Sequence, residues 1–421
     1  NGYRFVAIDS QARGNRGEYA MMADVQCGIN YQIKVGSDII LNPFEVREEE
    51  EWSEMDGDYM VLKLKDKVED ARSSLMIMVQ GNKGAADFEL TTYLERVITD
   101  IIVELYEERG IIDGQVDSLF EEGLQEKEIL GSGKRRKTLP TMTDFYKKAL
   151  KKERDNEIRE HKKAYRILLD SLKERIRELY YCPKCLRFYT RKEYESLKHI
   201  CGCGENGHKI QAIQGVKSYF DGQSNVVIDR NVKFTNIDLS QLPEEERAVA
   251  RLVALSFVTE HFIKKNAINP KKMEYMGVIC DELHENFKSL PAVQKLDYVS
   301  RTSRKRLVSL WTATQALKDY QRMPETEALL KQAATKFVFK QDYQDRSWVK
   351  EALNLTNGQA DRILELGGDP SDKSEDRKGE VCIVDNGKVC FCKVDYLKAA
   401  EAVFVETDAR TLQAMYGGEA G

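Results

Sequence analysis

Short apolar runs alternate with amphipathic helical segments at both ends of the chain. Near the start, YRFVAID (3–9) and YQIKVGSDIILNPF (31–44) predict two strands, and GEYAMMADVQC between them predicts a helix. The second half repeats this alternation and closes with a hairpin, GEVCIVDNGKVCFCKV, turned at Asp385, Asn386 and Gly387. Its other predicted strands are SNVVIDRNVKFTNIDLSQL, MGVICDE, LVSLWTATQ and KFVFKQ, and its predicted helices are PEEERAVARLVALSFVTEHFIKK, LDYVSRTSRKR, TEALLKQAA and RSWVKEAL. Strands that alternate with helices indicate an α/β fold whose mostly parallel sheet is covered on both faces.

The middle of the chain has a different character. From about Val46 to Tyr180 it is rich in charged, helix-forming segments such as DFELTTYLERVITDIIVELYEERG, which predict a mostly α-helical domain. The basic GSGKRRKT (131–138) is interpreted as a solvated loop within it. We therefore predict a core domain in two parts, 1–45 and 216–421, interrupted by an all-α domain at 46–215 that carries an insert at 180–210.

Composition limits the classes of function. Of the 421 residues 32% are charged, and the net charge of -5 argues against a uniformly basic surface for nucleic acid, although a local basic patch is compatible with it. No apolar run approaches the roughly 18 residues that cross a bilayer, and the first residues lack a signal-peptide pattern. We therefore expect a cytoplasmic protein whose nine cysteines are thiols or metal ligands rather than disulfides.

Two adjacent acids follow the predicted strand MGVIC. Ligands of parallel α/β sheets bind at the carboxyl ends of the strands, where Asp281 and Glu282 would emerge. An apolar strand followed by Asp-Glu is the Walker B pattern, in which the first acid can hold the Mg²⁺ of a nucleotide through its water shell and the second can orient or deprotonate an attacking water. Strands also end in acids without any such role, so the pattern needs support from its neighbours.

The next predicted strand supplies a neutral amide at the same edge. LVSLWTATQ carries Thr312, Thr314 and Gln315 at its end, so the Gln315 amide would lie beside the acids and could contact both a γ-phosphate and the water; a polar residue that merely ends a strand is the alternative. The preceding helix carries four cationic side chains: Arg301, Arg304, Lys305 and Arg306. One of them could reach the phosphate bound by a neighbouring subunit; the alternative is that they form a solvated basic face. RKGE (377–380) is a second candidate for the contact in trans.

An ordered set of these segments resembles the ATPases of conjugative transfer and type IV secretion, of the VirB-type, TraC- or TraE-like kind within the HerA and FtsK group. The set comprises FVAID, LNPF, GQSNVVIDRNVKFTNIDLSQL, VICDE, SRK followed by TATQ, FVFKQ and KGEVCIV. The resemblance implies a RecA-like P-loop core interrupted by an all-α domain, commonly assembled as a hexamer. It also implies that ATP hydrolysis with Mg²⁺ drives a membrane-spanning channel, which would place the protein at the inner face of the membrane through its partners.

The same resemblance assigns roles to single residues. Asp281, as the Mg²⁺ ligand, and Glu282 would be the Walker B pair, and Gln315 would be the sensor. Arg304 lies in the Arg-Lys segment that would act in trans. Glu380 lies in the late Gly-Glu motif and would contact the nucleotide; from its place beside Gln315 at the strand end, Thr314 is expected to do so too.

Two departures from the family pattern stand out. The first strand usually continues as Ile-Asp-Pro-Glu, but here IDSQARGNRGEY has Ser10 and Gln11 and extra residues before Glu18. A P-loop, G-x-x-x-x-G-K-[ST], should precede the strand at Phe5 and is absent; GSGKRRKT lacks the first glycine and has no Ser or Thr after Lys134. We therefore expect an amino-terminally truncated chain that is inactive alone, the intact parent being the enzyme.

The insert contains two pairs of cysteines. Cys182 and Cys185 form C-x-x-C, and Cys201 and Cys203 form C-x-C after fifteen intervening residues. Two thiol pairs on turns can close a tetrahedral Zn²⁺ site that is structural, because four sulfur ligands leave no open position. Two histidines are possible substitute ligands, His199 and His208, and the other five cysteines are expected in the core.

Three functions remain open from the sequence. The first is a secretion or conjugation ATPase. The second is a DNA-pumping motor of the FtsK, HerA or coupling-protein kind, which would show DNA-stimulated hydrolysis. The third is a non-enzymatic zinc-containing scaffold with a decayed nucleotide site, against which the combination of Asp281, Glu282 and Gln315 argues.

Overall fold

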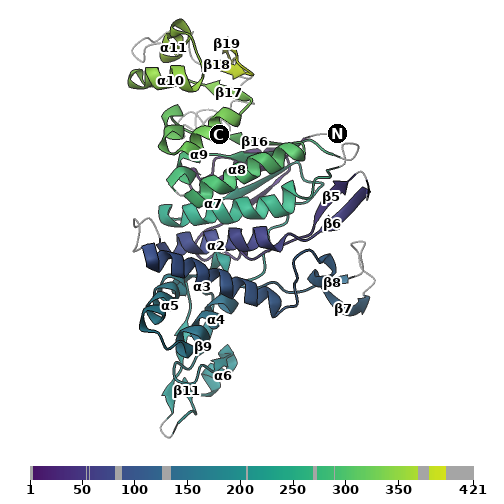
Figure 1. The fold of residues 1–421 in the computed structure, drawn as a ribbon, viewed down its shortest axis with the longest axis vertical. Coiled ribbons are helices and arrows are strands. Elements are labelled where there is room, and N and C mark those ends of the chain that lie inside the picture. Colours follow the sequence, from purple (N-terminus) through teal and green to yellow (C-terminus); the bar gives the residue numbers. More distant parts are fainter. Residues whose placement is uncertain are drawn as a thin grey trace, which may run out of the picture.

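The molecule is elongated, with a sheet and its helices in the middle and smaller units at both ends (Figure 1). The computed structural model describes residues 3–53, 55, 57–80, 88–125, 134–204, 207–268, 273–288, 290–367 and 379–394. Within these ranges the cysteine insert lies at one end and the last hairpin at the other.

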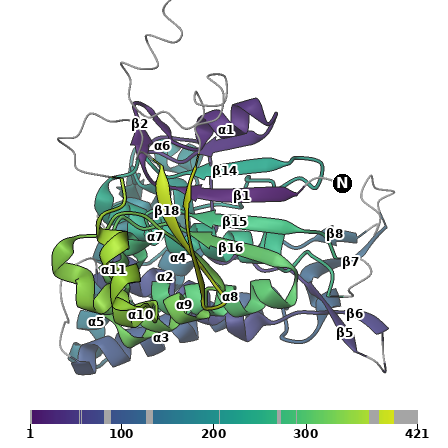
Figure 2. The same cartoon turned by 90° about the horizontal axis from the view of Figure 1, so that it is seen from above.

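A five-stranded parallel sheet forms the centre. Its order is β16-β15-β1-β14-β4, and every neighbouring pair is parallel. The strands are β1 (Arg4–Asp9), β4 (Ile29–Gln32), β14 (Phe234–Asp238), β15 (Met276–Cys280) and β16 (Val308–Thr312). Parallel strands place all their carboxyl ends at one edge, which can be followed in Figure 2. The α/β prediction is therefore confirmed, and strands from the two ends of the chain share one sheet.

The two faces of this sheet are covered unequally. On one face α7 (Glu244–Val258) packs on β1, and α8 (Leu290–Lys305) packs on β16 and α7. On the other face α1 (Ala20–Val25) covers β14 and β4. Beyond α1, apolar side chains line a hollow of about 350 Å³, among them Phe5, Ile279 and Trp311, the last 53% exposed. Complete cover of both faces was expected, and the described residues provide it for one face only.

Four helices form the inserted domain between the two parts of the sheet. They are α2 (Leu64–Gln80), α3 (Phe88–Glu107), α4 (Met142–Asp155) and α5 (Arg159–Leu172), and α2 packs on α7. The domain is not purely helical, because it also contains two hairpins, β5 (Glu49–Ser53) with β6 (Gly57–Val61) and β7 (Phe120–Gln125) with β8 (Lys134–Arg136). The second hairpin corrects the loop predicted at 131–138, of which 131–133 lie outside the described residues.

The insert and the end of the chain form small sheets of their own. In the insert, β9 (Leu179–Tyr181) pairs with β10 (Phe188–Tyr189) and β13 (Gln211–Ile213), and β11 (Ile200–Cys201) pairs with β12 (His208–Lys209); α6 (Arg191–Ser196) lies between β10 and β11 in the chain.

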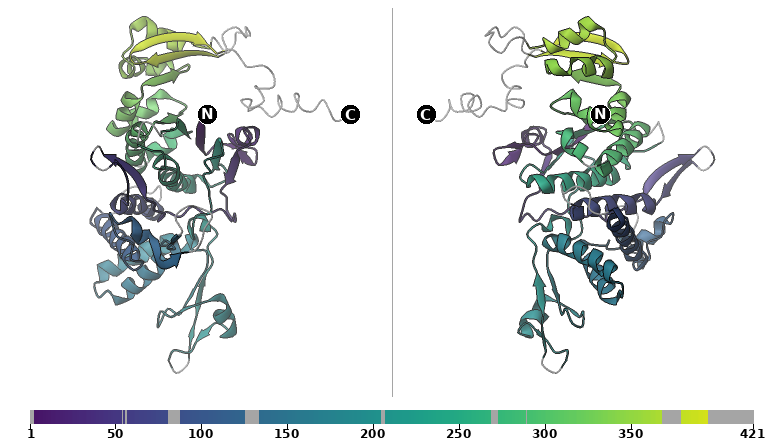
Figure 3. Two further views of the ribbon diagram at one scale, coloured as in Figure 1. Left: turned by 90° about the vertical axis from the view of Figure 1, so that its right-hand side faces the viewer. Right: turned by 60° about the vertical axis from the view of Figure 1, so that its left-hand side comes forward.

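Toward the end come α9 (Pro324–Gln332), β17 (Thr335–Val338), α10 (Arg346–Ala352), α11 (Asn357–Leu364), β18 (Glu380–Asp385) and β19 (Lys388–Lys393). β17, β18 and β19 form a separate antiparallel sheet. The predicted hairpin turn is confirmed, since Asn386 and Gly387 both have the positive φ of a type I′ turn, 46° and 80°. Figure 3 shows both end units projecting from the central body.

Candidate functional site

Asp281 and Glu282 form a tight turn at the carboxyl end of β15. The Glu282 amide donates to Asp281 Oδ1 at 2.8 Å, and the chain then continues into the 3₁₀ segment η5 (Leu283–Lys288). Glu282 has a φ of 50°, a left-handed conformation that is costly for a residue with a side chain. The amide of Leu283 donates to the Ala313 carbonyl at 2.8 Å, which fastens this turn to the end of β16. The turn is therefore held in one unusual conformation beside the next strand.

The Glu282 carboxylate is surrounded by polar side chains although only 7% of the residue is exposed. Gln315 Nε2 donates to both carboxylate oxygens, at 3.1 and 3.3 Å. Gln11 Nε2, from the loop after β1, donates to Oε1. His284 Nδ1 lies 2.9 Å from Oε2, and its Nε2 lies 3.1 Å from Glu285 Oε1. The structure thus brings Gln315 to Glu282, as the order of strands suggested, and adds Gln11 and His284.

A second pair of acids ends the neighbouring strands. Asp9 of β1 and Asp238 of β14 are paired in the sheet register and both are fully buried. The loop that follows β1 folds over them, because the Tyr19 amide donates to Asp9 at 2.9 Å and the Gly17 amide donates to Asp238 at 2.8 Å. A Cβ on Gly17 would lie 2.1 Å from Asp9 Oδ2, so only glycine permits this approach.

Burial of Asp9 affects its protonation. Burial raises the pKa of Asp9 to about 7, repulsion from Asp238 adds to the rise, and hydrogen bonds from the Tyr19 and Gln11 amides oppose it. The two acids therefore form an anchor for the loop that carries Gln11, and they place a titrating group beside the candidate site.

The remaining predicted residues lie in different places. Thr314 Oγ1 donates to Asp319 at 2.7 Å, close to Gln315 in the chain. Arg304 is exposed near the carboxyl end of α8, which leads into the amino end of β16, so the structure does not bring it to Glu282 of the same chain. Arg306 is buried and donates to backbone carbonyls, among them that of Asn266 at 2.7 Å. It is therefore unsuited to act in trans.

The late motif belongs to the separate terminal sheet. Glu380 begins β18, where its Oε2 accepts from the Gly367 amide at 3.2 Å. Arg377 and Lys378 of the same motif lie outside the described residues.

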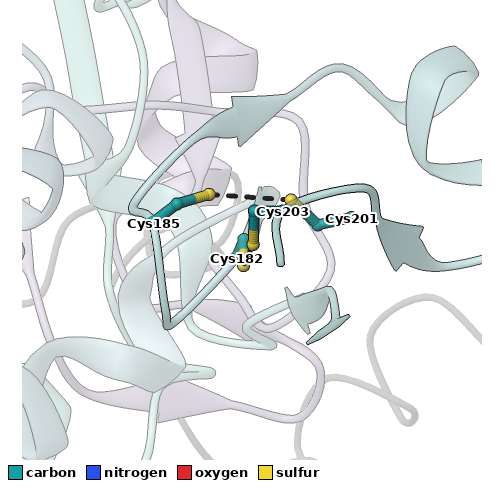
Figure 4. A group of neighbouring side chains, drawn as sticks. All are labelled: Cys182, Cys185, Cys201 and Cys203. Carbon is teal, nitrogen blue, oxygen red and sulfur yellow. Dashed lines mark hydrogen bonds between the residues drawn. The ribbon is translucent and has the colours of Figure 1, made fainter. Parts of the chain in front are cut away.

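The four cysteines of the insert converge on one point. Their sulfurs all lie within 4.8 Å of one another, with Cys182 and Cys203 3.5 Å apart and Cys185 and Cys201 3.6 Å apart (Figure 4). Four thiolates around Zn²⁺ at about 2.3 Å lie about 3.8 Å from each other, so the donor set and its spacing fit a tetrahedral site. Within the part of the chain that the structure describes, these four cysteines form a group that could enclose a metal ion.

Backbone turns and rings support this cluster. The Leu186 amide donates to the Cys182 carbonyl at 2.8 Å, and Leu186 itself has a positive φ of 53°. His208 Nδ1 lies 2.7 Å from the Cys203 carbonyl oxygen, and His199 stacks on Tyr194 with ring centroids 4.1 Å apart. His199 and His208, the two possible substitute ligands, therefore pack around the cysteine cluster, and the four cysteine sulfurs form the candidate ligand set.

Known structures share this fold. A solved structure of VirB4 from Thermoanaerobacter pseudethanolicus superposes with a TM-score of 0.60 and 18% identity, covering 94% of this chain and 83% of that chain. The plasmid coupling protein TrwB, in complex with a non-hydrolysable ATP analogue, gives a TM-score of 0.46 and 10% identity over 94% of this chain and 86% of that chain. No protein-family model and no curated protein matches the chain.

None of the helices in the described residues has the length and apolar character needed to span a bilayer. The chain has the RecA-like α/β fold of VirB4, as its resemblance to the conjugation and type IV secretion ATPases led us to expect.

Proposed function

We propose that the chain is part of an ATPase that energises a conjugation or type IV secretion machine. The contact between Gln315 Nε2 and the Glu282 carboxylate, at 3.1 and 3.3 Å, carries this proposal, because it joins a neutral amide to an acid at the carboxyl ends of adjacent parallel strands. That edge of a parallel sheet is where nucleotide sites form. The shared fold with VirB4 supports the same conclusion.

The side chains have distinct roles in this proposal. Asp281 would hold Mg²⁺ through its water shell, and the metal would balance charge on the phosphates. Glu282 accepts the proton of the attacking water, and Gln315 orients that water and responds to the γ-phosphate. Thr314 and Glu380 contact the nucleotide, and Arg304 serves a neighbouring subunit of a ring, in keeping with its exposure.

The 421 residues contain no G-x-x-x-x-G-K-[ST]. In the described residues β16 is an edge strand of the sheet, and its Trp311 lines the apolar hollow on the uncovered face together with Ile279 of β15. We propose that this edge of the sheet is where a phosphate-binding loop completes the site.

Hydrolysis assays separate this function from its alternatives. The product of the complete coding sequence is assayed for Mg²⁺-dependent ATP hydrolysis with and without DNA. Activity indifferent to DNA is expected of a secretion ATPase. Strong stimulation by DNA would replace the proposal with a DNA-pumping motor, and absence of hydrolysis would replace it with a scaffold.

We also propose that Cys182, Cys185, Cys201 and Cys203 hold one structural Zn²⁺. The converging sulfurs support this, and the metal would tie the two hairpins of the insert together. Metal analysis of the purified protein is expected to give one zinc per chain. A Cys185→Ser, Cys201→Ser variant that retains a full equivalent of zinc would contradict the assignment.

A further inference from the structure

Arg251 is a buried cation whose hydrogen bonds converge on the Asp281–Glu282 turn. It lies on α7, is 3% exposed, and donates to the carbonyl of Glu282 at 2.6 Å and to the carbonyl of Asp281 at 2.9 Å. It also donates to Asn286 Oδ1 at 2.8 Å and to the Ser10 hydroxyl. One guanidinium thus joins the turn, the segment that follows it and the end of β1.

This arrangement differs from that of another buried arginine, Arg175, which follows α5 of the inserted domain. Arg175 donates to the Glu246 carboxylate at 2.7 Å, so its charge has a direct counter-ion. The four hydrogen-bond acceptors of Arg251 are two carbonyls, an amide oxygen and a hydroxyl. Burying a charge without a bonded carboxylate is costly, and carbonyl groups must be fixed in place to compensate for it.

The turn that Arg251 contacts needs such support. Glu282 has a φ of 50°, and its ordinary right-handed alternative would turn the carboxylate away from Gln315 and Gln11. Arg251 binds the carbonyls on both sides of this residue, which opposes rotation of the backbone. Arg247, one helical turn earlier, donates to the Ser10 carbonyl at 3.0 Å and fixes the neighbouring strand end in the same way.

We propose that Arg251 is a positioning residue for the general base: it holds the Asp281–Glu282 turn in its left-handed conformation and locks it to the end of β1 through Ser10. The inference rests on the proposed function, because it assumes that Glu282 activates the water. Its effect is exerted through Glu282, and misplacing a reacting group by about 1 Å can cost about 100-fold in rate.

The test compares Arg251→Met and Arg251→Lys with Arg175→Met, in the product of the complete coding sequence. Arg175 is the matched control, since it is also buried and bonds to a residue of the same helix, but that residue is Glu246 and not part of the turn. For Arg251→Met we expect kcat to fall about 10- to 100-fold with the KM for ATP nearly unchanged. Arg251→Lys is expected to recover part of kcat, because an ammonium can donate to the same carbonyls.

Hydrogen exchange gives a second readout that does not require hydrolysis. The Leu283 and Glu285 amides, which bond to the Ala313 and Glu282 carbonyls, are expected to exchange faster in Arg251→Met and unchanged in Arg175→Met. Equal loss of kcat in the two Met variants, or unaltered exchange at these amides in Arg251→Met, would overturn the inference. If the wild-type protein does not hydrolyse ATP, the proposed function fails, and exchange alone decides whether Arg251 holds the turn.

Discussion

At the scale of single residues, Glu282 has a strained backbone conformation and a carboxylate that accepts hydrogen bonds from several side chains. Strained non-glycine residues persist where the surrounding structure fixes them, and they are concentrated at functional sites. Gln11 and Gln315 both donate to Oε1 of Glu282, from loops that follow different strands. The position of this carboxylate is therefore determined by several elements at once.

Replacing Gln11 by Ala removes one of the two amide donors. We expect kcat to fall by about 10- to 100-fold, which corresponds to about one hydrogen bond to a charged group, while the KM for ATP changes little. Gln332→Ala is the matched control, because Gln332 bonds to the surface carboxylate of Asp297. A kcat for Gln11→Ala equal to that of the control would show that the contact is incidental.

Asp9 predicts a pH dependence of stability. Its pKa is raised by burial from 3.8 to about 7, so between these values the folded protein keeps a proton that the unfolded chain has released. The free energy of unfolding should therefore fall as the pH rises from about 4 to about 7. Denaturant unfolding at about pH 5 and about pH 8 should show this loss in the wild type and a smaller one in Asp9→Asn. An equal loss in both proteins would contradict the assignment.

At the scale of elements, the cysteine insert depends on its ligands more than on a core. Its own buried cluster is small and includes Tyr180, Cys182, Tyr189, Cys201 and Ile210. A unit with so little apolar surface needs a metal or other staple to fold. The main core, which runs through the parallel sheet and the inserted helices and includes a few residues at the base of the insert, is large and does not share this need.

Chelation should therefore unfold the insert selectively. Removing zinc is expected to expose the segment between Tyr180 and Ile213 to proteolysis, and the parallel sheet should keep its melting transition. Limited proteolysis with and without a chelator, followed by mass analysis of the fragments, measures this. Cleavage that is the same in both conditions would argue against a structural metal.

The elements also show what the sequence could and could not reveal. The apolar runs at β1 and β15 predicted buried central strands of a parallel sheet, because such strands carry nearly continuous apolar sequence. The hairpin of β5 and β6 was hidden by its glutamate-rich sequence, which favours a helix locally.

The candidate site was only partly foreseeable for a similar reason. Asp281, Glu282 and Gln315 follow strands whose order could be anticipated, but Gln11 lies 271 residues from Glu282 and contacts it only through the fold. In the sequence, Arg251 is only one of several polar residues in a helix. Its contacts with the Asp281–Glu282 turn depend on the packing of α7 against that turn. The proposed domain boundaries and the roles of Arg304 and Glu380 stay predictions.

At the scale of the whole molecule, a buried ionic cluster joins the inserted helices to the α/β core. Asp70 of α2 accepts from Ser256 of α7 at 2.7 Å and pairs with Lys295 of α8, and Lys67 donates to Ser256 at 3.1 Å. Burial alone would raise the pKa of Asp70, but Lys295 and Lys67 outweigh it and lower the pKa. Three elements from two parts of the chain therefore depend on one carboxylate.

Replacing Asp70 by Asn leaves two buried lysines facing each other without their counter-ion. Breaking such a cluster costs about 3–5 kcal/mol, so the free energy of unfolding should fall by about this amount. Asp66→Asn is the matched control on the same helix, because Asp66 is exposed, and its effect should stay within about 0.5 kcal/mol. Denaturant unfolding of both variants checks this, and equal stability would mean that the cluster does not hold the two parts together.

The most direct test of the account is Mg²⁺-dependent ATP hydrolysis by Glu282→Gln, in the product of the complete coding sequence. Glu244→Gln is the matched control, since Glu244 lies exposed in the first turn of α7 and pairs with Lys288. The account predicts that Glu282→Gln lowers kcat by about 100-fold or more while nucleotide is still bound, and that Glu244→Gln keeps wild-type activity. A Glu282→Gln protein that hydrolyses ATP at the wild-type rate would contradict the assignment of Glu282 as the general base.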